Sequence, residues 1–332
     1  AQLGRLDNAL SMAREWRNRS LEAPADAEIA IGQIEAMAGR PRDALATLEK
    51  WKDQIISSAD QAPQPLIVYA RQLAIVGRAD EADALLRPRA EKSSYWASAY
   101  AAVGRVLVDD PQATRKWLDR AASLATTDTQ ARLLLGQAWF DLAGRTRDTA
   151  DYQKVVDVLA GLETQEKAAA GLLLATTHDL LGNVADADRC YRLAIEALPD
   201  NAAALNNFAY FLIKTGGSTA EAETLAERAV SAAQREGLAG SVLGGMIHTL
   251  AEARLKSGQH AAAEQAFNRG LAADPSNPHL LLGLIETHLA IGRADDAAAN
   301  MQRLDSVLRA GVPDDDDFKQ RLENARKAIA KR

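Results

Sequence analysis

The residues of this chain best suited to catalysis or metal binding are its five histidines, His178, His248, His260, His279 and His288. A metal site would need further ligands spaced as in HExxH or CxxC, or a cluster of carboxylates and histidines at ligand spacing. The sequence contains none of these patterns. His178 and His288 fall at packing positions of helical segments, so we interpret them as structural. The sequence therefore predicts no metal ligand, no cofactor and no catalytic residue.

Three other polar features have structural interpretations as well. Cys190 lies close to Asp186 and Asp188, whose negative charge disfavours a reactive thiolate. The segment 238–241 precedes a helix but lacks the glycine pattern of a phosphate-binding loop. The acidic run 314–317 either forms a recognition patch or complements the positive N-terminal end of the last helix, and we favour the helix end.

The composition excludes several classes of protein. The 332 residues are 47% hydrophobic but only 5% aromatic, which favours helix over sheet, and the net charge of −6 gives no basic footprint for nucleic acid. No apolar run approaches the roughly 20 residues that span a bilayer, so we expect no direct membrane insertion. A single cysteine excludes an internal disulfide and leaves the compartment open.

The elements that would position any site come from an internal repeat. The segment 171–199 reads as two amphipathic helices joined at Gly182 and ended by Pro199. Glycines at the same turn position are Gly4, Gly39, Gly77, Gly182, Gly217, Gly258 and Gly292. An alanine follows each by five residues, at Ala9, Ala44, Ala82, Ala187, Ala222, Ala263 and Ala297. Small residues at one register position indicate two helices that approach closely.

A helix–turn–helix unit with this pattern, repeated after 34 residues from Gly258 to Gly292, resembles the tetratricopeptide repeat (TPR) family. The resemblance covers nearly the whole chain. It implies an all-α fold, a right-handed superhelical solenoid of antiparallel helix pairs, in one continuous domain over residues 1–332.

The repeat boundaries follow from the turn and proline signals. We expect a half repeat at 1–24, full repeats at about 25–58, 63–93, 94–128, 129–167, 168–201, 202–243, 244–277 and 278–311, and a C-terminal capping helix at 313–330. In the fourth repeat a lengthened turn, 145–151, predicts a displaced second helix from Tyr152 to Leu162. Because the chain begins inside a predicted repeat, we interpret it as a segment of a longer protein.

The first helix of each unit lines the inner groove in this architecture, and its residues three or four apart share one face. The register places these residues in the groove: Gln33, Arg71, Gln137, Thr176, Asp179, Asn206, Tyr210, Lys214, His248, Glu252, Lys256, His279 and Glu286. We predict the partner-binding residues to be Asn206, Tyr210, Lys214, His248, Glu252 and Lys256, with the side chains of Asn206 and Tyr210 facing solvent. An aromatic ring flanked by polar groups suits capture of an extended peptide or a partner helix.

One functional subclass of the family is disfavoured. TPR proteins that clamp the C-terminal carboxylate of chaperones carry lysine, asparagine and arginine on three successive first helices. The matching positions here hold Leu172, Thr176, Asn207, Gly245 and Thr249, and only Asn207 fits.

The sequence thus predicts a non-enzymatic scaffold that binds a protein or peptide in its concave groove. An alternative is the docking or regulatory region of an enzyme whose catalytic domain lies outside this segment, and a third is self-association. The resemblance to long bacterial TPR arrays implies a bacterial protein, either cytoplasmic or periplasmic.

Overall fold

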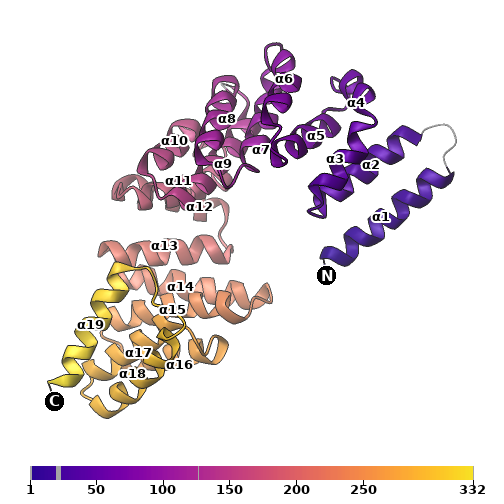
Figure 1. Cartoon of the computed structure of the whole chain (residues 1–332). Helices are drawn as coiled ribbons and strands as arrows, with labels where there is room; N and C mark the ends of the chain where they lie inside the picture. The colour runs from indigo at the N-terminus through magenta and orange to yellow at the C-terminus, as the bar shows by residue number, and fades with distance from the viewer. Residues whose placement is uncertain (1, 20–23, 126, 332) are drawn as a thin grey trace. The chain divides into compact units, whose positions relative to one another are not determined.

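The computed structural model describes residues 2–19, 24–125 and 127–331, and their regular structure is entirely helical. They form nineteen α-helices and one short 3-10 helix, which confirms the predicted all-α fold (Figure 1). By packing, the chain divides into two compact units, residues 1–162 and 163–332. We call these unit 1 and unit 2.

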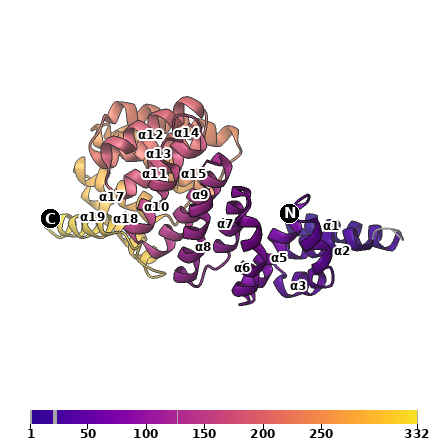
Figure 2. The same ribbon diagram turned by 90° about the horizontal axis from the view of Figure 1, so that it is seen from above.

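Unit 1 contains α1 (Gln2–Arg19), α2 (Pro24–Met37), α3 (Pro41–Glu49), α4 (Lys52–Ser58), α5 (Pro63–Ile75), α6 (Ala79–Ala90), η1 (Ser94–Trp96), α7 (Ala97–Gly104), α8 (Pro111–Leu124), α9 (Thr129–Thr146) and α10 (Thr149–Leu159). Unit 2 contains α11 (Ala169–Leu180), α12 (Val184–Ala197), α13 (Ala202–Thr215), α14 (Thr219–Arg235), α15 (Gly240–Lys256), α16 (His260–Ala273), α17 (Pro278–Ala290), α18 (Ala294–Leu308) and α19 (Asp316–Ala330). Within each unit, helices that follow one another pack as antiparallel pairs (Figure 2).

Glycines in the left-handed region end the first helix of many pairs. Gly39, Gly77, Gly182, Gly258 and Gly292 have φ between 71° and 86°, where a side chain would be strained. The second helices begin with polar caps in several pairs, as at Ser218, whose hydroxyl accepts from the Glu221 amide. These glycines confirm the predicted turn positions.

The alanines of the repeat are contact points between paired helices. Ala44, Ala82, Ala187, Ala222, Ala263 and Ala297 are fully buried. The residues four positions further on include the fully or nearly fully buried Leu48, Leu86, Tyr191 and Phe267. The small residue lets the helices approach, and the large one fills the space beside it.

Two predicted turns are wrong in detail. Gly4 lies inside α1, which begins at Gln2, so there is no turn at that glycine. In the sixth repeat Gly216, with φ of 73°, ends α13, and Gly217 follows it without a left-handed φ.

The lengthened turn predicted for the fourth repeat is wrong as well. Helix α9 continues to Thr146, and only two residues separate it from α10, which begins at Thr149 rather than Tyr152. Arg147 adopts a left-handed conformation with φ of 56°, and Asp148 caps α10 by accepting from the Ala150 amide. An arginine performs the role that glycine performs in the other turns.

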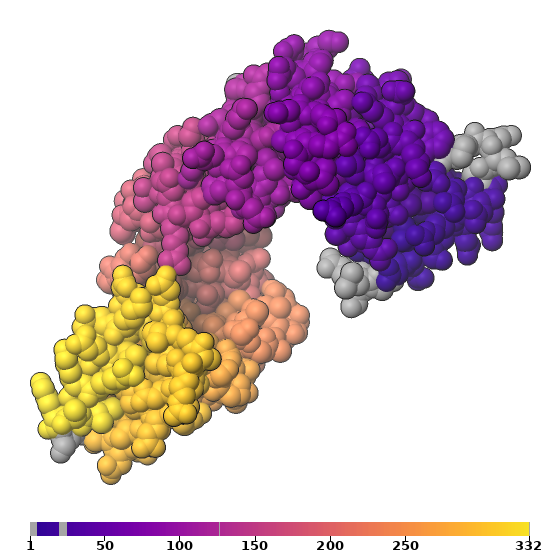
Figure 3. All heavy atoms as spheres, in the orientation of Figure 1, coloured from indigo at the N-terminus to yellow at the C-terminus, as the bar shows by residue number. Residues whose placement is uncertain are grey.

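The last helix, α19, packs on α17 and α18 through one apolar stripe. Phe318, Leu322 and Ala325 are buried on this stripe, at the spacing of one helix face. Asp315 caps the helix, because its Oδ1 accepts from the amides of Asp317 and Phe318. Figure 3 shows the yellow C-terminal residues covering one end of unit 2.

Candidate partner-binding groove

The first helices of three successive pairs, α13, α15 and α17, lie next to one another in unit 2 and form the groove face. Between them is a cavity of about 280 Å³, here called the groove cavity. It is lined by Asn206, Asn207, Tyr210, Gly245, His248, Thr249, Asn277 and His279. Three of the six predicted partner-binding residues, Asn206, Tyr210 and His248, therefore line one cavity.

Tyr210 is the open aromatic side chain of this cavity. It is 46% exposed, whereas Phe208 and Phe211 on the same helix are buried and stack with Tyr191 in the core. Burial raises the pKa of Tyr210, the negative charge of Asp315 raises it further, and Lys214 opposes the rise. The ring is therefore accessible to a partner and lies in a negative electrostatic environment.

Asn206 supplies an unused acceptor one turn before Tyr210. Its Oδ1 is covered by neighbouring protein atoms, and no described protein group donates a hydrogen bond to it. A buried acceptor without a donor is costly, so the side-chain amide of Asn206 gains a hydrogen bond if it turns toward the cavity and meets a donor of a ligand there.

Lys214, one turn after Tyr210, has a partner of its own. Its Nζ donates to Asp179 Oδ1 at 2.9 Å, joining α13 to α11. Lys214 and Asp179, both placed in the groove by the sequence, form an ion pair that leaves little net positive charge there. Lys256 is exposed at the end of α15 and does not line the groove cavity.

His248 stands in a row of rings on the cavity wall. Its ring centroid lies 6.2 Å from that of Phe267 and 5.8 Å from that of His279. The His279 ring meets the edge of Phe318 at 4.8 Å, so α19 contributes to this row. Burial lowers the pKa of His279, and neighbouring His248 lowers it further, so His279 is neutral at pH 7.

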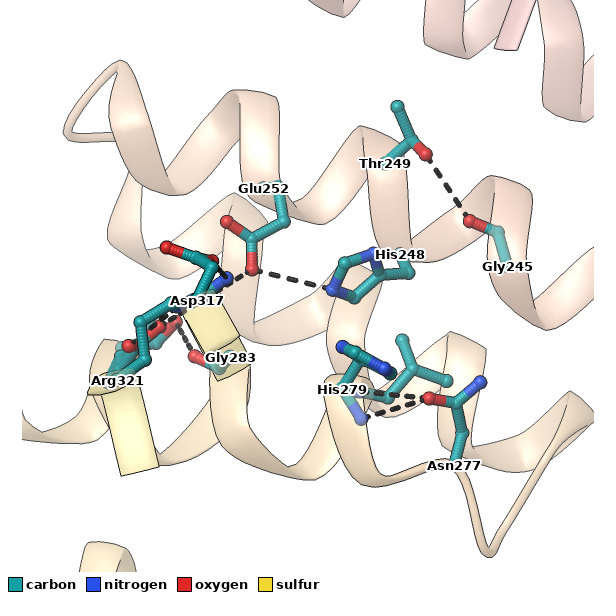
Figure 4. Close-up of polar contacts among 12 residues, drawn as sticks. Gly245, His248, Thr249, Glu252, Asn277, His279, Gly283, Asp317 and Arg321 are labelled. Atoms are coloured by element: carbon teal, nitrogen blue, oxygen red, sulfur yellow. Dashed lines mark hydrogen bonds and ion pairs between the residues drawn. The ribbon is translucent and has the colours of Figure 1, made fainter. Parts of the chain in front are cut away.

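Glu252, which the sequence placed in the groove, does not face solvent. It is only 4% exposed, because α19 lies over it and Arg321 Nη2 donates to its Oε1 at 2.6 Å. His248 Nε2 lies 3.4 Å from the same oxygen, without the alignment of a hydrogen bond (Figure 4). Burial would raise the pKa of Glu252, but the contacts to His248 and Arg321 outweigh it and lower the pKa to about 2.

Arg321 also binds Glu286 on α17, which the sequence placed in the groove. Its Nε donates to Glu286 Oε1 at 3.0 Å, and its Nη2 donates to the other carboxylate oxygen. One end of the predicted groove is thus filled by the chain's own last helix. The groove cavity at α13 and the first half of α15 stays open.

The structure adds Asn277 to the predicted site, and it adds Asn207, Gly245 and Thr249, which the sequence considered only as clamp positions. Asn277 caps α17 by accepting from the amides of His279 and Leu280, so its place at the cavity follows from a helix-start signal. Arg321 had no signal in the sequence, because it lies 69 residues from Glu252.

Two of the other histidines are buried and contact neighbouring side chains. His178 Nδ1 lies 3.3 Å from the side-chain Nδ2 of Asn183, and His288 lies beside Glu264 and Asn300. Burial raises the pKa of the Cys190 thiol, as expected for an unreactive cysteine.

The described residues include no group of three or more His, Cys, Asp or Glu that could hold a metal ion. Of the helices described, none is both long enough and apolar enough to cross a membrane.

A larger cavity, about 640 Å³, lies in unit 1 between α6, α7 and α8. Its wall includes the rings of Tyr100 and Trp117, 5.0 Å apart. Several of its polar groups satisfy one another: Tyr100 donates to Asp83 at 2.8 Å, and Arg87 pairs with the same carboxylate. It has no buried polar atom without a partner, unlike the groove cavity.

Known proteins match the fold described above. A family model described as tetratricopeptide repeat matches residues 254–315, which hold the end of α15, α16, α17 and α18. Over these residues the chain is similar to the tetratricopeptide repeat family. The matched segment includes the helix pair next to α19 and one wall of the groove cavity.

Among solved structures, the chain is similar to one in the APC/C hetero-tetramer Cut9–Hcn1, with a TM-score of 0.51 and 14% identity over 95% of this chain. It spans 59% of that chain, and at this identity the likeness shows the fold alone. PilW, a widely conserved type IV pilus biogenesis factor, has a TM-score of 0.47 and 23% identity over 59% of this chain and 90% of its own. Yeast Tom70 has a TM-score of 0.46 and 13% identity over 93% and 65%. A search of curated protein sequences finds no match.

Proposed function

We propose that the chain is a non-enzymatic protein-interaction scaffold, and that the groove cavity of unit 2 binds an extended segment or helix of a partner protein. Tetratricopeptide repeats generally serve as scaffolds for protein–protein interaction, which sets the class of function. The observation that carries the choice of surface is Tyr210, an open aromatic ring beside the unpaired acceptor of Asn206.

The chemistry of the cavity suits binding rather than catalysis. Its wall holds amide, hydroxyl, imidazole and phenol groups, and the carboxylate nearest to His248 is engaged by Arg321. An aromatic anchor surrounded by hydrogen-bonding groups is the typical centre of a binding interface. The partner would bury the Tyr210 ring and satisfy Asn206 Oδ1.

Gly245 offers a direct test, because a Cβ added there would meet no atom within 4 Å. The substitution Gly245→Leu would extend a side chain from the cavity wall, and replacing a helical glycine favours the helix by about 0.5–1 kcal/mol. Loss of binding in this variant would therefore not come from unfolding. Gly144 in α9 of unit 1 is a matched control, since a Cβ there also meets nothing.

The experiment captures partners from an extract of the host with tagged wild type, Gly245→Leu and Gly144→Leu, and quantifies them by mass spectrometry. We expect a set of proteins that wild type and Gly144→Leu retain and Gly245→Leu loses. Titration calorimetry with one of these partners then measures the difference in affinity. Equal retention by all three chains would place the binding surface elsewhere.

A further inference from the structure

We propose that the partner segment is positively charged, with a lysine or arginine side chain that lies against the exposed ring of Tyr210 and donates to Asn206 Oδ1 once that side-chain amide turns toward the cavity. This inference rests on the proposed function and names the chemical class of the partner. Four observations support it. Acidic residues of α19 lie beside the cavity, and the cations near the cavity are already paired with carboxylates. Asn206 provides an acceptor on the cavity wall, and Arg321 is already bound on the same face.

The acidic segment comes from the start of α19. The start of α19 lies beside the cavity, because the Phe318 ring packs 4.8 Å from that of His279 on the cavity wall. The negative charges of Asp315 and Asp317 both raise the pKa of the Tyr210 phenol. The Asp315 carboxylate is fixed by its two hydrogen bonds to the α19 amides, so its position does not depend on a partner. A cation placed over the Tyr210 ring would meet this negative charge as well as the electron-rich ring face.

The cations near the cavity are compensated. Lys214 pairs with Asp179, and Lys319 pairs with Asp314 and Asp316. Arg321 is shared by three carboxylates, Glu252, Glu286 and Asp317, so that cluster keeps an excess of negative charge. Most of the net charge of −6 comes from unit 2.

The histidines of the cavity do not cancel this excess of negative charge. His279 is neutral at pH 7 for the reasons given above, and His248 lies beside Glu252 on its own helix. Lys256 is the remaining cation of α15, and it stands two turns from His248, about 12 Å along the helix. The cavity is therefore an acidic environment at neutral pH.

The hydrogen-bonding groups fit the same partner. Asn206 Oδ1 needs a donor, and a lysine ammonium or arginine guanidinium consists only of donors. An acidic segment would bring further acceptors next to an unpaired acceptor, with the carboxylates of α19 nearby. It would gain nothing from Asn206 Oδ1 and would be repelled by Asp315.

The groove face already binds one arginine through carboxylates. Arg321 enters from α19 and reaches Glu252 on α15 (Figure 4) and Glu286 on α17. Phe318, one turn earlier on α19, lies against His279. Here an arginine and an aromatic ring occupy adjacent positions on the same face. In the groove cavity Tyr210 supplies the ring, and a side chain of the partner would supply the cation.

The test uses the full chain and two fluorescein-labelled peptides with the same glycine–serine background, one carrying lysines and the other glutamates at the same positions. Fluorescence anisotropy measures their affinities at low and high salt. We expect the lysine peptide to bind much more tightly than the glutamate peptide, and its affinity to fall as the salt concentration rises. A glutamate peptide that binds equally well or better would overturn the inference.

Variants locate the bound peptide. Tyr210→Leu should weaken the lysine peptide about tenfold, and Tyr210→Phe should restore most of the affinity because it keeps the ring. Asp317→Asn should weaken it about threefold, while Asp295→Asn, an exposed acid in the first turn of α18, should have little effect. Affinity unchanged in Tyr210→Leu and Gly245→Leu would place the peptide outside the cavity and overturn the inference.

The experiments distinguish failure of the proposed function from failure of the inference about the charge of the partner. If Gly245→Leu loses natural partners but the lysine peptide does not bind, the cavity is a binding site for a segment of different charge, and only the inference fails. If Gly245→Leu retains every natural partner, the proposed function fails, whatever the peptides do.

Discussion

Arg321 joins three helices of unit 2, because its guanidinium on α19 contacts Glu252 on α15 and Glu286 on α17. Removing one partner of a buried ion pair is costly, since the charge that remains has lost its compensation. The Glu252 carboxylate is the most buried member of this cluster. Single residues here therefore control whether the last helix stays in place over the groove face.

Glu252→Gln should lower the free energy of unfolding at pH 7 by about 1–3 kcal/mol, through loss of a charged hydrogen bond to Arg321. The folded-state pKa of Glu252 is about 2, below its ordinary value of 4.5, so its ionised form stabilises the fold above pH 4.5. That contribution is lost as the pH falls from 4.5 towards 2.

Urea unfolding of wild type and Glu252→Gln at pH 6 and pH 3 measures this effect. The difference between the two proteins should shrink at the lower pH. Glu236→Gln, at the exposed end of α14, is the control and should change stability little at either pH. A difference that is equal at both pH values would contradict the role given to the Glu252 charge.

At the scale of the helix, the antiparallel pairs depend on small residues at their crossing points. Ala187 of α12 is fully buried at the contact with α11, whereas Ala185 on the same helix is exposed. The two alanines have the same helix propensity, so a difference between them reports packing alone.

Ala187→Trp should overpack the α11–α12 contact and cost about 1–3 kcal/mol of stability. Ala185→Trp should cost much less, because its side chain can extend into solvent. Thermal unfolding of the two variants provides the comparison. Equal melting temperatures would mean that the helix pair is not held by close approach at Ala187.

Helix α1 has a thin contact with its neighbour. It packs on α2 by burying Leu10 and Ala13 against Ile31, and it leaves Met12 and Trp16 exposed. Helix α15, in contrast, packs against α13, α14, α16 and α17. We expect amide hydrogen exchange to be fastest in α1 and slow in α11 and α15. Uniform protection from α1 onward would show that the contact with α2 is sufficient.

At the scale of the whole molecule, the sequence predicts most features that recur and few that occur once. The positive φ of Gly182 and the burial of Ala187 follow from a pattern seen in several repeats. The short turn before α10 does not, because an arginine rarely takes the conformation that Arg147 has. A single departure from the repeat has no second copy to reveal it.

Part of the candidate site could likewise be predicted from the sequence, and part could not. Asn206, Tyr210 and His248 could be placed by helix periodicity, since the spacing of first helices brings them to one face. The burial of Glu252 could not, because it depends on α19, which is not part of a helix pair. Long-range contacts of a terminal helix leave no periodic signal, so the sequence predicted an open groove where the structure has a covered one.

The central claim is that a partner binds the groove cavity through Tyr210 and Asn206. Titration calorimetry with a captured partner on wild type and the double variant Asn206→Ala/Tyr210→Ala tests it most directly. Tyr95→Ala in unit 1 is the control, because Tyr95 is 44% exposed and Tyr210 46%. We predict that the double variant binds about 1–4 kcal/mol more weakly, with little change in melting temperature, and that Tyr95→Ala binds as wild type does. Equal affinities for wild type and the double variant would contradict the claim.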